Sequence, residues 1–476
     1  MCARGKRNNG IVVGGQWSVV CALYFELCTW FFFLEGLLSS TTELKAPITK
    51  YKAQNTNNEQ LTLSFLMTSV LNTTPVQTVQ ELLTLPEVAH AFRFFEANAE
   101  VITEEQIGIC SIPASPFDEK RRAEYLCAKF REIGLADTSI DDEGNCLGLR
   151  KGNSLAPLLV VSAHLDTVFP PETDFSVSRV HNKLLGPGIS DDGCGLIALV
   201  AIARALQASR IETEGSILFV GTVGEEGEGN LRGVRYLLTG SKWMNRVDAF
   251  LSLDGPGVDR ITNRALGSRR YRVNLRGPGG HSWGDFGIPN PVHALGRAIY
   301  RLASYPAPRS PRTTFNVGRI EGGASINAIP SDAAMDVDLR SADDLELKRL
   351  DAYFRRAVIE ATDEENATRR PGDSPLELKI QLVGERPTGE TPADSPLVEL
   401  AQKATRALGI EPRLDQSSTD SNLPISLGIP AVTLGAGGES GCSHTLDEWY
   451  DPRGRDKGLK RALLVILGVV GIKKQR

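Results

Sequence analysis

The sequence has no Cys-x-x-Cys pair, no long run of lysine or arginine, and no internal repeat. Its eight cysteines are scattered and form no dense framework, so we expect mostly buried free thiols in a reducing compartment. The formal net charge is only -5, and acidic and basic residues are interspersed. Because nothing in the sequence predicts a basic surface that follows a phosphate backbone, nucleic acid is not an expected partner.

The sequence also lacks an apolar stretch that is both long and free of charge. Residues 19–38 are apolar and follow a few basic residues, as in a signal or an anchor. Glu26 and Glu35 lie inside this stretch, and a carboxylate in hydrocarbon costs on the order of a few kcal/mol. We therefore predict that residues 1–66 are an N-terminal extension that is non-functional or weakly signal-like, and that the protein is cytoplasmic without a membrane partner. The alternative is export or membrane anchoring, if residues 18–39 act as a signal.

The 476 residues are enough for at least two domains. Continuous apolar runs, typical of strands that are buried on both faces, occur at residues 158–163, 216–222, 249–253 and 431–434. A helical pattern lies between the first two runs. This alternation predicts an α/β fold, with a mostly parallel sheet and flanking helices, over residues 67–267 and 385–476.

Between residues 268 and 384 the pattern changes. Residues 271–275 alternate as a half-exposed strand, and Asn290 and Pro291 stand at the cap and first turn of a helix. Two more strands follow, then a helix that we expect Ser341 to cap, and then a last alternating strand. The order β-α-β-β-α-β predicts an inserted second domain at residues 268–384.

Polar residues gather at or near the predicted ends of the parallel strands. They are His164, Asp191, Glu225, Glu226, Asp254 and His444. Taken singly, each has an ordinary explanation, such as a helix cap for Asp191 or a solvated acidic loop for the two glutamates. Ligands of α/β proteins bind beyond the carboxyl ends of the strands, so the joint occurrence of these residues there favours a metal site.

The chemistry of these side chains favours zinc. Adjacent acids such as Glu225 and Glu226 repel one another unless cations offset their charge. One of them can then bind metal while the other takes a proton from a metal-bound water. Imidazole and carboxylate ligands without thiolate suit two Zn²⁺ ions, with Co²⁺ or Mn²⁺ as substitutes.

Five segments of the sequence resemble, in order, the metal-site motifs of the M20 family of metallopeptidases. They are Ser162-Ala163-His164-Leu165-Asp166-Thr167, Asp191-Asp192, Glu225-Glu226, Asp254 and Ser443-His444. That family includes tripeptide aminopeptidases, dipeptidases, carboxypeptidases and N-acyl-amino-acid deacylases. The resemblance extends from about Leu83 to the C-terminus. It implies a catalytic domain of the di-zinc exopeptidase type and a lid and dimerisation domain at residues 268–384.

The resemblance also implies roles for the site residues. Asp191 would bridge two zinc ions, His164 and Asp254 would complete one site, and Glu226 and His444 would complete the other. Glu225 would be the general base. Asp166 would hydrogen-bond the ring nitrogen of His164 that faces away from the metal. The Asp191-Asp192 peptide would be cis.

Three further residues are implied by resemblance to parts of the lid, and a glycine of a late loop is a fourth candidate. Gly279-Gly280-His281-Ser282 resembles a stretch whose histidine enters the active site of a partner subunit and stabilises the oxyanion, which implies a homodimer through the lid. Asn327 and Arg340 resemble substrate-binding residues, and Arg340 suits a carboxylate. Gly435 lies in a glycine-rich loop that could approach a substrate. The structural alternatives are a capping histidine and an ordinary glycine-rich loop.

These patterns together predict a di-zinc metallopeptidase that hydrolyses short peptides by attack of a metal-bound hydroxide, with Glu225 as general base. The Gly-Gly-His-Ser-Trp and Ser-Thr-Asp-Ser-Asn segments resemble tripeptidase-like members of the family and favour substrates with a free N-terminus. One alternative is an N-acyl-amino-acid deacylase or deacetylase that uses the same site. Another is a non-catalytic peptide or metal binder, against which Glu225 argues, because a binder has no use for an unligated base.

Overall fold

The computed structural model describes residues 76–473. The predictions for residues 1–66, including the apolar stretch at residues 18–39, therefore lie outside the described residues. Within residues 76–473, no helix combines the length and the hydropathy that a membrane span requires. The described cysteines are free thiols, and all of them except Cys442 are buried.

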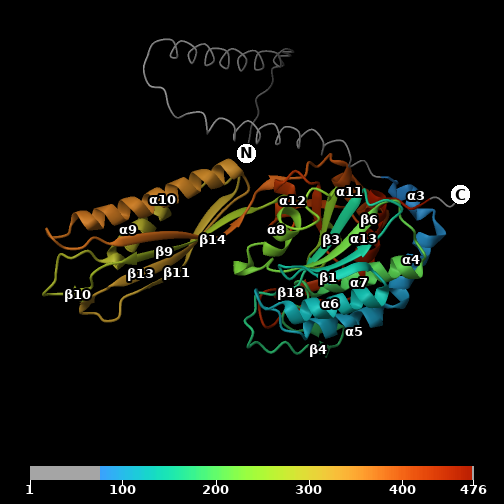
Figure 1. Cartoon of the computed structure of the whole chain (residues 1–476), viewed down its shortest axis with the longest axis horizontal. Helices are drawn as coiled ribbons and strands as arrows, with labels where there is room; N and C mark the ends of the chain where they lie inside the picture. The colour runs from blue at the N-terminus through green and yellow to red at the C-terminus, as the bar shows by residue number, and fades with distance from the viewer. Residues whose placement is uncertain (1–75, 474–476) are drawn as a thin grey trace, which may run out of the picture. The chain divides into compact units, whose positions relative to one another are not determined.

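A nine-stranded sheet forms the centre of the larger domain (Figure 1). Its strands are β1 (Ala136–Ile140), β2 (Cys146–Arg150), β3 (Leu158–His164), β6 (Ser216–Thr222), β7 (Ala249–Leu253), β8 (Arg260–Ala265), β15 (Gly389–Glu390), β16 (Arg413–Ser417) and β17 (Ala431–Leu434). Their order is β1-β2-β6-β3-β7-β17-β8-β15, and β16 pairs with β8. Strands β6, β3, β7 and β17 run parallel, whereas β2 and β8 join them antiparallel. The prediction of a mostly parallel sheet is confirmed.

Helices cover both faces of this sheet (Figure 1). They are α3 (Val79–Leu83), α4 (Pro86–Ala97), α5 (Ala99–Cys110), α6 (Lys120–Ile133), α7 (Gly193–Ala208), α8 (Arg232–Thr239), α11 (Pro396–Ala407), α12 (Asn422–Ser426) and α13 (Arg455–Val470). Successive residues of β3 point to opposite faces. Leu159 and Val161 pack in the core with α7 and α13, while Leu158 and Val160 pack with α8 and α12. A strand buried on both faces is apolar at every position, which is why its sequence reads as a continuous run.

A separate antiparallel sheet forms the second domain, which we call the lid domain. It consists of β9 (Gly267–Arg276), β11 (Thr313–Gly322), β13 (Asp332–Ser341) and β14 (Glu377–Arg386), with helices α9 (Pro291–Ala303) and α10 (Asp344–Ala367) and the short pair β10 (Gly280–His281) and β12 (Ala328–Ile329). The strand order is β11-β13-β9-β14. Its chain order matches the predicted β-α-β-β-α-β pattern.

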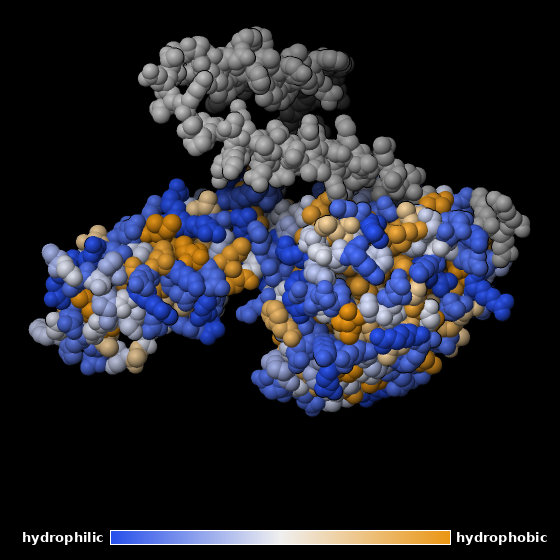
Figure 2. Space-filling model, viewed as in Figure 1, coloured by the Kyte–Doolittle hydropathy of each residue, from blue (hydrophilic) through white to orange (hydrophobic). Residues whose placement is uncertain are grey.

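The two faces of the lid sheet differ in chemistry. On one face, Tyr271 and Val273 pack in a core with α9 and α10. The other face carries charged side chains that pair between strands, such as Arg272 with Asp336 at 3.0 Å. Among the residues that the structure describes, the side seen in Figure 2 is mostly hydrophilic, with smaller apolar areas between.

The predicted helix caps of the lid domain had mixed outcomes. Asn290 caps α9 as predicted, because its side chain accepts hydrogen bonds from the amides of Val292 and His293. The prediction for Ser341 was wrong, since Ser341 is the last residue of β13 and Asp343 caps α10. Ser341 instead accepts a hydrogen bond from the amide of Asp343. Both residue types cap helices well, and only the length of the strand decides between them.

Candidate metal centre

Six polar side chains converge at the carboxyl end of the large sheet. His164 ends β3, Asp191 lies in the turn before α7, Glu225 and Glu226 follow β6, Asp254 follows β7, and His444 lies in the loop between β18 (Glu439–Gly441) and β19 (Trp449–Asp451). One ligand atom each from His164, Asp191 and Asp254 lie within 4.8 Å of one another, and the same holds for Asp191, Glu226 and His444. Asp191 belongs to both groups.

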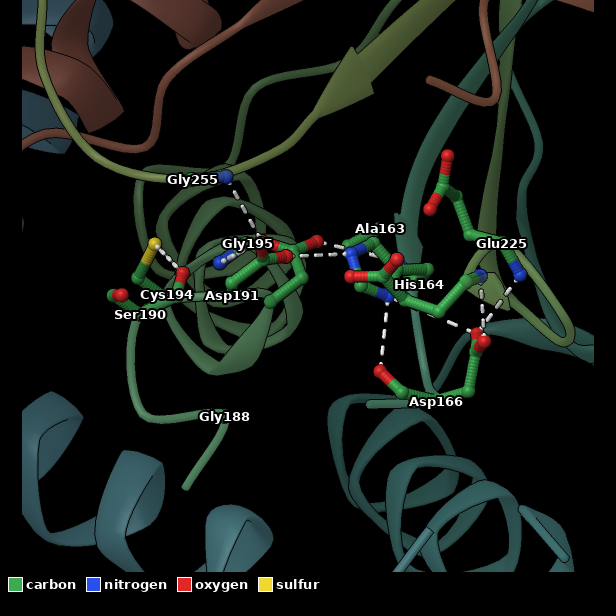
Figure 3. Close-up of polar contacts among 12 residues, drawn as sticks. Ala163, His164, Asp166, Gly188, Ser190, Asp191, Cys194, Gly195, Glu225 and Gly255 are labelled. Atoms are coloured by element: carbon green, nitrogen blue, oxygen red, sulfur yellow. Dashed lines mark hydrogen bonds and ion pairs between the residues drawn. The ribbon is translucent and has the colours of Figure 1, made fainter. Parts of the chain in front are cut away.

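The carboxylate of Asp191 lies between the two histidines. Its Oδ1 is 2.9 Å from Nε2 of His164, and its Oδ2 is 3.0 Å from Nε2 of His444. Nε2 of His444 is also 3.0 Å from Oε1 of Glu226. Figure 3 shows His164 directed at Asp191 from the end of its strand. Ligand atoms that share a zinc ion, each about 2 Å from the metal, lie about 3 Å apart, so these spacings suit a shared cation.

The other nitrogen of His164 is held by Asp166, although not through the side chain as predicted. Nδ1 donates to the backbone carbonyl of Asp166 at 3.0 Å, whereas the nearest carboxylate oxygen is 3.7 Å away. The carboxylate of Asp166 instead accepts a hydrogen bond from the amide of Glu225 at 3.0 Å (Figure 3). It also accepts one from the amide of Glu226 at 2.7 Å. Because Nδ1 carries the donated proton, Nε2 of a neutral ring keeps its lone pair for a metal.

The helix cap that was the alternative role for Asp191 belongs to its neighbour. Asp192 accepts hydrogen bonds from the amide of Gly195 in α7, from that of His164 and from that of Gly255. Asp192 thus ties together the ends of β3 and β7 and the start of α7. The Asp191-Asp192 peptide is cis, as the family resemblance implied.

Electrostatic effects in this cluster indicate an excess of carboxylate. Burial raises the pKa of Asp254 to about 7, and repulsion from Asp191 adds to the rise. Hydrogen bonds to Asp191 and Glu226 raise the pKa of His444 to about 10. Burial also raises the pKa of Glu225 well above its usual value. Side chains that hold protons this strongly are crowded anions, and divalent cations would balance the same charge. The donor set therefore fits a pair of metal ions.

Sequence reasoning missed the closest partner of Glu225, which is Arg386. Nη1 of Arg386 donates to Oε1 of Glu225 at 2.9 Å, and Nη2 donates to the backbone carbonyl of Glu225. Both side chains are buried. A carboxylate oxygen of Glu225 remains within 4.8 Å of ligand atoms of His164 and Glu226. Arg386 ends strand β14, two residues beyond the predicted end of the second domain at residue 384, so no pattern in the sequence marked it.

A cavity of about 650 Å³ opens over this cluster. The metal-site residues and Glu225 line it, and Arg340 does so as well. The lining holds five arginines, namely Arg260, Arg270, Arg340, Arg386 and Arg413. Arg270 and Arg340 both contact Asp338, at 3.3 and 2.6 Å. The lining of the cavity therefore combines the acidic cluster with five basic side chains.

Three of the four residues that were implied in the lid and the late loops do not line this cavity. His281 and Asn327 are exposed neighbours in the lid, where the carbonyl of Asn327 accepts a hydrogen bond from the amide of Ser282. Nδ1 of His281 accepts hydrogen bonds from the amides of two residues that follow it, at 3.2 Å. Gly435 is buried, and a Cβ there would lie 2.1 Å from the carbonyl oxygen of Pro256. Close backbone packing thus accounts for this glycine.

Comparisons with known proteins show which family model and which relatives this chain resembles. Residues 160–468 match the model described as peptidase family M20/M25/M40. The succinyl-diaminopimelate desuccinylase of Corynebacterium glutamicum is 26% identical over 352 residues, which are 71% of this chain and 89% of that protein.

Two solved structures share the fold. A tripeptidase from Staphylococcus aureus matches with a TM-score of 0.66 and 21% identity, over 78% of this chain and 99% of its own. The YxeP protein of Bacillus subtilis, described as a dinuclear metal binding peptidase from the M20 family, matches with a TM-score of 0.57 and 17% identity, over 79% of this chain and 99% of its own.

Proposed function

Because this chain belongs to peptidase family M20/M25/M40, we propose that it is a di-zinc hydrolase of short peptides. The coarser statement, that the chain is a hydrolase of amide bonds, follows from the family itself. The finer statement rests on one observation. Candidate ligand atoms of His164, Asp191 and Asp254 lie within 4.8 Å of one another. The same holds for Asp191, Glu226 and His444, so the two groups share Asp191.

In this proposal, different residues bind the metal ions, transfer the proton and position the base. His164, Asp191 and Asp254 would hold one metal ion, and Asp191, Glu226 and His444 the other. The bound ions supply Lewis acidity, which polarises a substrate carbonyl and acidifies water. Glu225 takes the proton from the attacking water and delivers it to the leaving amine. Arg386 holds the Glu225 carboxylate in place through the 2.9 Å contact.

The lid domain would supply substrate contacts. Arg340 lines the cavity and is suited to the terminal carboxylate of a short peptide. His281 is exposed in the lid and does not line the cavity of its own chain. We propose that it acts across a homodimer, in the site of the partner subunit, where it stabilises the oxyanion while Asn327 contacts the substrate. The likeness to a tripeptidase of Staphylococcus aureus supports the peptide substrate.

A second candidate function is the removal of an acidic acyl group from an amino acid. The five arginines of the cavity wall favour it, because a substrate with two carboxylates could engage more than one of them. The similarity to a desuccinylase of Corynebacterium glutamicum supports the same substrate class. The metal ligands do not separate the candidates, since both reactions break an amide bond.

A comparison of two substrates decides between these functions. The zinc-loaded full chain would be given a free tripeptide and N-succinyl-alanine at equal concentration, and the released amines would be measured. The Glu225→Gln variant serves as the blank for both. The peptidase proposal predicts the larger kcat/KM for the tripeptide. Turnover of the succinyl substrate alone would replace it with the second candidate.

A further inference from the structure

Glu448 has a buried carboxylate whose hydrogen-bond donors all come from one turn. Its side chain is fully buried, with 0% of its surface exposed. Oε2 accepts from the amide of Gly188 at 2.8 Å. Oε1 accepts from the amide and the hydroxyl of Ser190, at 2.8 and 2.6 Å, and from the amide of Asp191 at 3.0 Å. The donors lie more than 250 positions away in the sequence.

We propose that Glu448 is a positioning residue of the metal centre, which fixes the turn at residues 188–191 so that Asp191 faces both metal ions. This inference rests on the proposed function, because Asp191 is the residue that the two ligand groups share. Glu448 does not touch the reacting atoms. It acts through the backbone of the turn that presents Asp191.

The turn requires an anion on this side because three of its amides converge there. A carboxylate only accepts hydrogen bonds, so it can serve several convergent donors at once. The carbonyls of the turn have other partners. The side-chain amide of Gln106 donates to Ile189, the thiol of Cys194 donates to Ser190, and the amide of Gly193 donates to Gly188. Glu448 thus binds amides of the turn while other residues bind its carbonyls. Figure 3 shows this turn beside Asp191.

Glu448 also connects this turn to the loop that carries His444. The amide of Glu448 donates to the carbonyl of Thr445, and its own carbonyl accepts from the amide of Gly186. Immediately afterwards, β19 pairs with β5 (Lys183–Leu185), with Trp449 opposite Leu185. Two segments that are far apart in sequence are thus joined at both the side chain and the backbone of Glu448. This connection accounts for the 3.0 Å spacing between His444 and Asp191.

Removal of the Glu448 carboxylate should therefore weaken both metal sites together. In Glu448→Gln the side chain keeps its size, but one oxygen becomes an NH₂ group that faces amide donors. The turn then loses acceptors and relaxes, and Asp191 moves relative to both histidines. Loss of a ligand of one site only, as in Glu226→Gln, should instead weaken one metal more than the other.

The test is a zinc titration of the chelator-treated full chain against a competing zinc indicator, for wild type, Glu448→Gln and Asp447→Asn. Asp447 is the exposed neighbour of Glu448, so its variant makes the same charge change in the same loop. Glu448→Gln should lower the affinity for both metals by about 10- to 100-fold, the range for partners that orient metal ligands. Asp447→Asn should bind zinc with the affinity of the wild type. Equal zinc affinities of the two variants would overturn the inference about Glu448 but leave the proposed function unchanged. A wild-type chain that binds no metal would contradict both the inference and the proposed function.

Two further variants keep the test decisive if Glu448→Gln does not fold. Ser190→Ala removes only the hydroxyl that donates to Glu448 at 2.6 Å and should weaken both sites in the same direction. Glu448→Asp keeps the charge with a shorter reach and should give intermediate affinity. The cobalt-substituted proteins should show a changed visible absorption spectrum in Ser190→Ala. A merely structural role would lower the melting temperature of the metal-free variants but leave the zinc affinity and the cobalt spectrum unchanged.

Discussion

At the scale of single residues, hydrogen bonds give adjacent acids of the candidate metal centre different surroundings. Asp192 caps α7, and this leaves Asp191 free to face two histidines. The carboxylate of Asp166 accepts hydrogen bonds from the amides of Glu225 and Glu226 and so fixes the loop that carries both glutamates. Two acids that are adjacent in sequence thereby receive different environments, which is the condition for different roles.

Glu225 should be required for turnover but not for metal binding. Because Glu225→Gln keeps the size of the side chain but cannot take a proton, turnover should fall by about 10²- to 10⁴-fold. The metal content, measured by mass spectrometry of the digested protein, should stay at the wild-type value. Glu228→Gln, at an exposed acid of the same loop, is the control and should retain turnover. Unchanged turnover in Glu225→Gln would refute its role as the base.

Arg386 should act through Glu225. Lysine in its place has one ammonium group and cannot contact the carboxylate and the carbonyl of Glu225 and the hydroxyl of Ser418 together, as the guanidinium does. Arg386→Lys should therefore lower kcat more than it raises KM. In a double variant with Glu225→Gln, the arginine change should cause no further loss of turnover. Losses that multiply in the double variant would show that the two residues act independently.

The convergence of the candidate metal ligands could be predicted from the sequence, whereas the contacts that hold these residues in place could not. His164, Glu225 and Asp254 lie at or just after the ends of apolar strands, so their shared sheet edge follows from the sequence pattern. Arg386 and Glu448 reach the centre from segments more than 150 and 250 positions away from their partners. Only the packed structure brings such pairs together, and a buried arginine or glutamate looks like a surface residue in the sequence.

At the scale of elements, the parallel strands were predictable because burial on both faces leaves a continuous apolar run. The runs at Ser216–Thr222, Ala249–Leu253 and Ala431–Leu434 coincide with β6, β7 and β17. The cap of α10 was not predictable, because Ser341 and Asp343 both lie near its start. The conformation of the loop after β17 was also not predictable, since it depends on the segment that packs against it.

Gly435 illustrates that last point and gives a prediction about stability. A Cβ at this position would lie 2.1 Å from the carbonyl oxygen of Pro256, so Gly435→Ala should cost about 1–3 kcal/mol of the free energy of unfolding. Gly296→Ala is the control, because Gly296 lies in α9 with open space around its Cβ, and alanine favours a helix. Urea unfolding measures both. A Gly435→Ala protein of wild-type stability with a raised KM would instead support the predicted substrate contact.

At the scale of the whole molecule, the lid domain contacts the loop that carries Glu225 and Glu226. Arg386 and Arg270 of the lid sheet both bond the loop after β6, Arg270 through the carbonyl of Gly227. His281 and Asn327 lie elsewhere in the lid and outside the cavity. If both are needed for turnover, we expect a second chain to supply them.

A mixing experiment tests whether His281 acts across a dimer. His281→Ala and Glu225→Gln chains should each be nearly inactive alone. Unfolded together and refolded as a mixture, they should recover about a quarter of the wild-type rate, because half of the dimers contain both chains and each of these has one complete site. Size-exclusion chromatography with light scattering checks the dimer. No recovery in a mixture that does form dimers would place His281 outside the partner's site.

The most direct test of the di-zinc proposal is a metal reconstitution followed by turnover. Metal is removed from the full chain with a chelator, and zinc is then added back stepwise while hydrolysis of a tripeptide is measured. We predict no turnover in the metal-free protein, full turnover once two zinc ions are bound per chain, and no recovery in Asp191→Asn, which alters the shared ligand. Full turnover in the metal-free protein, or recovery in Asp191→Asn that equals the wild type, would contradict the proposal.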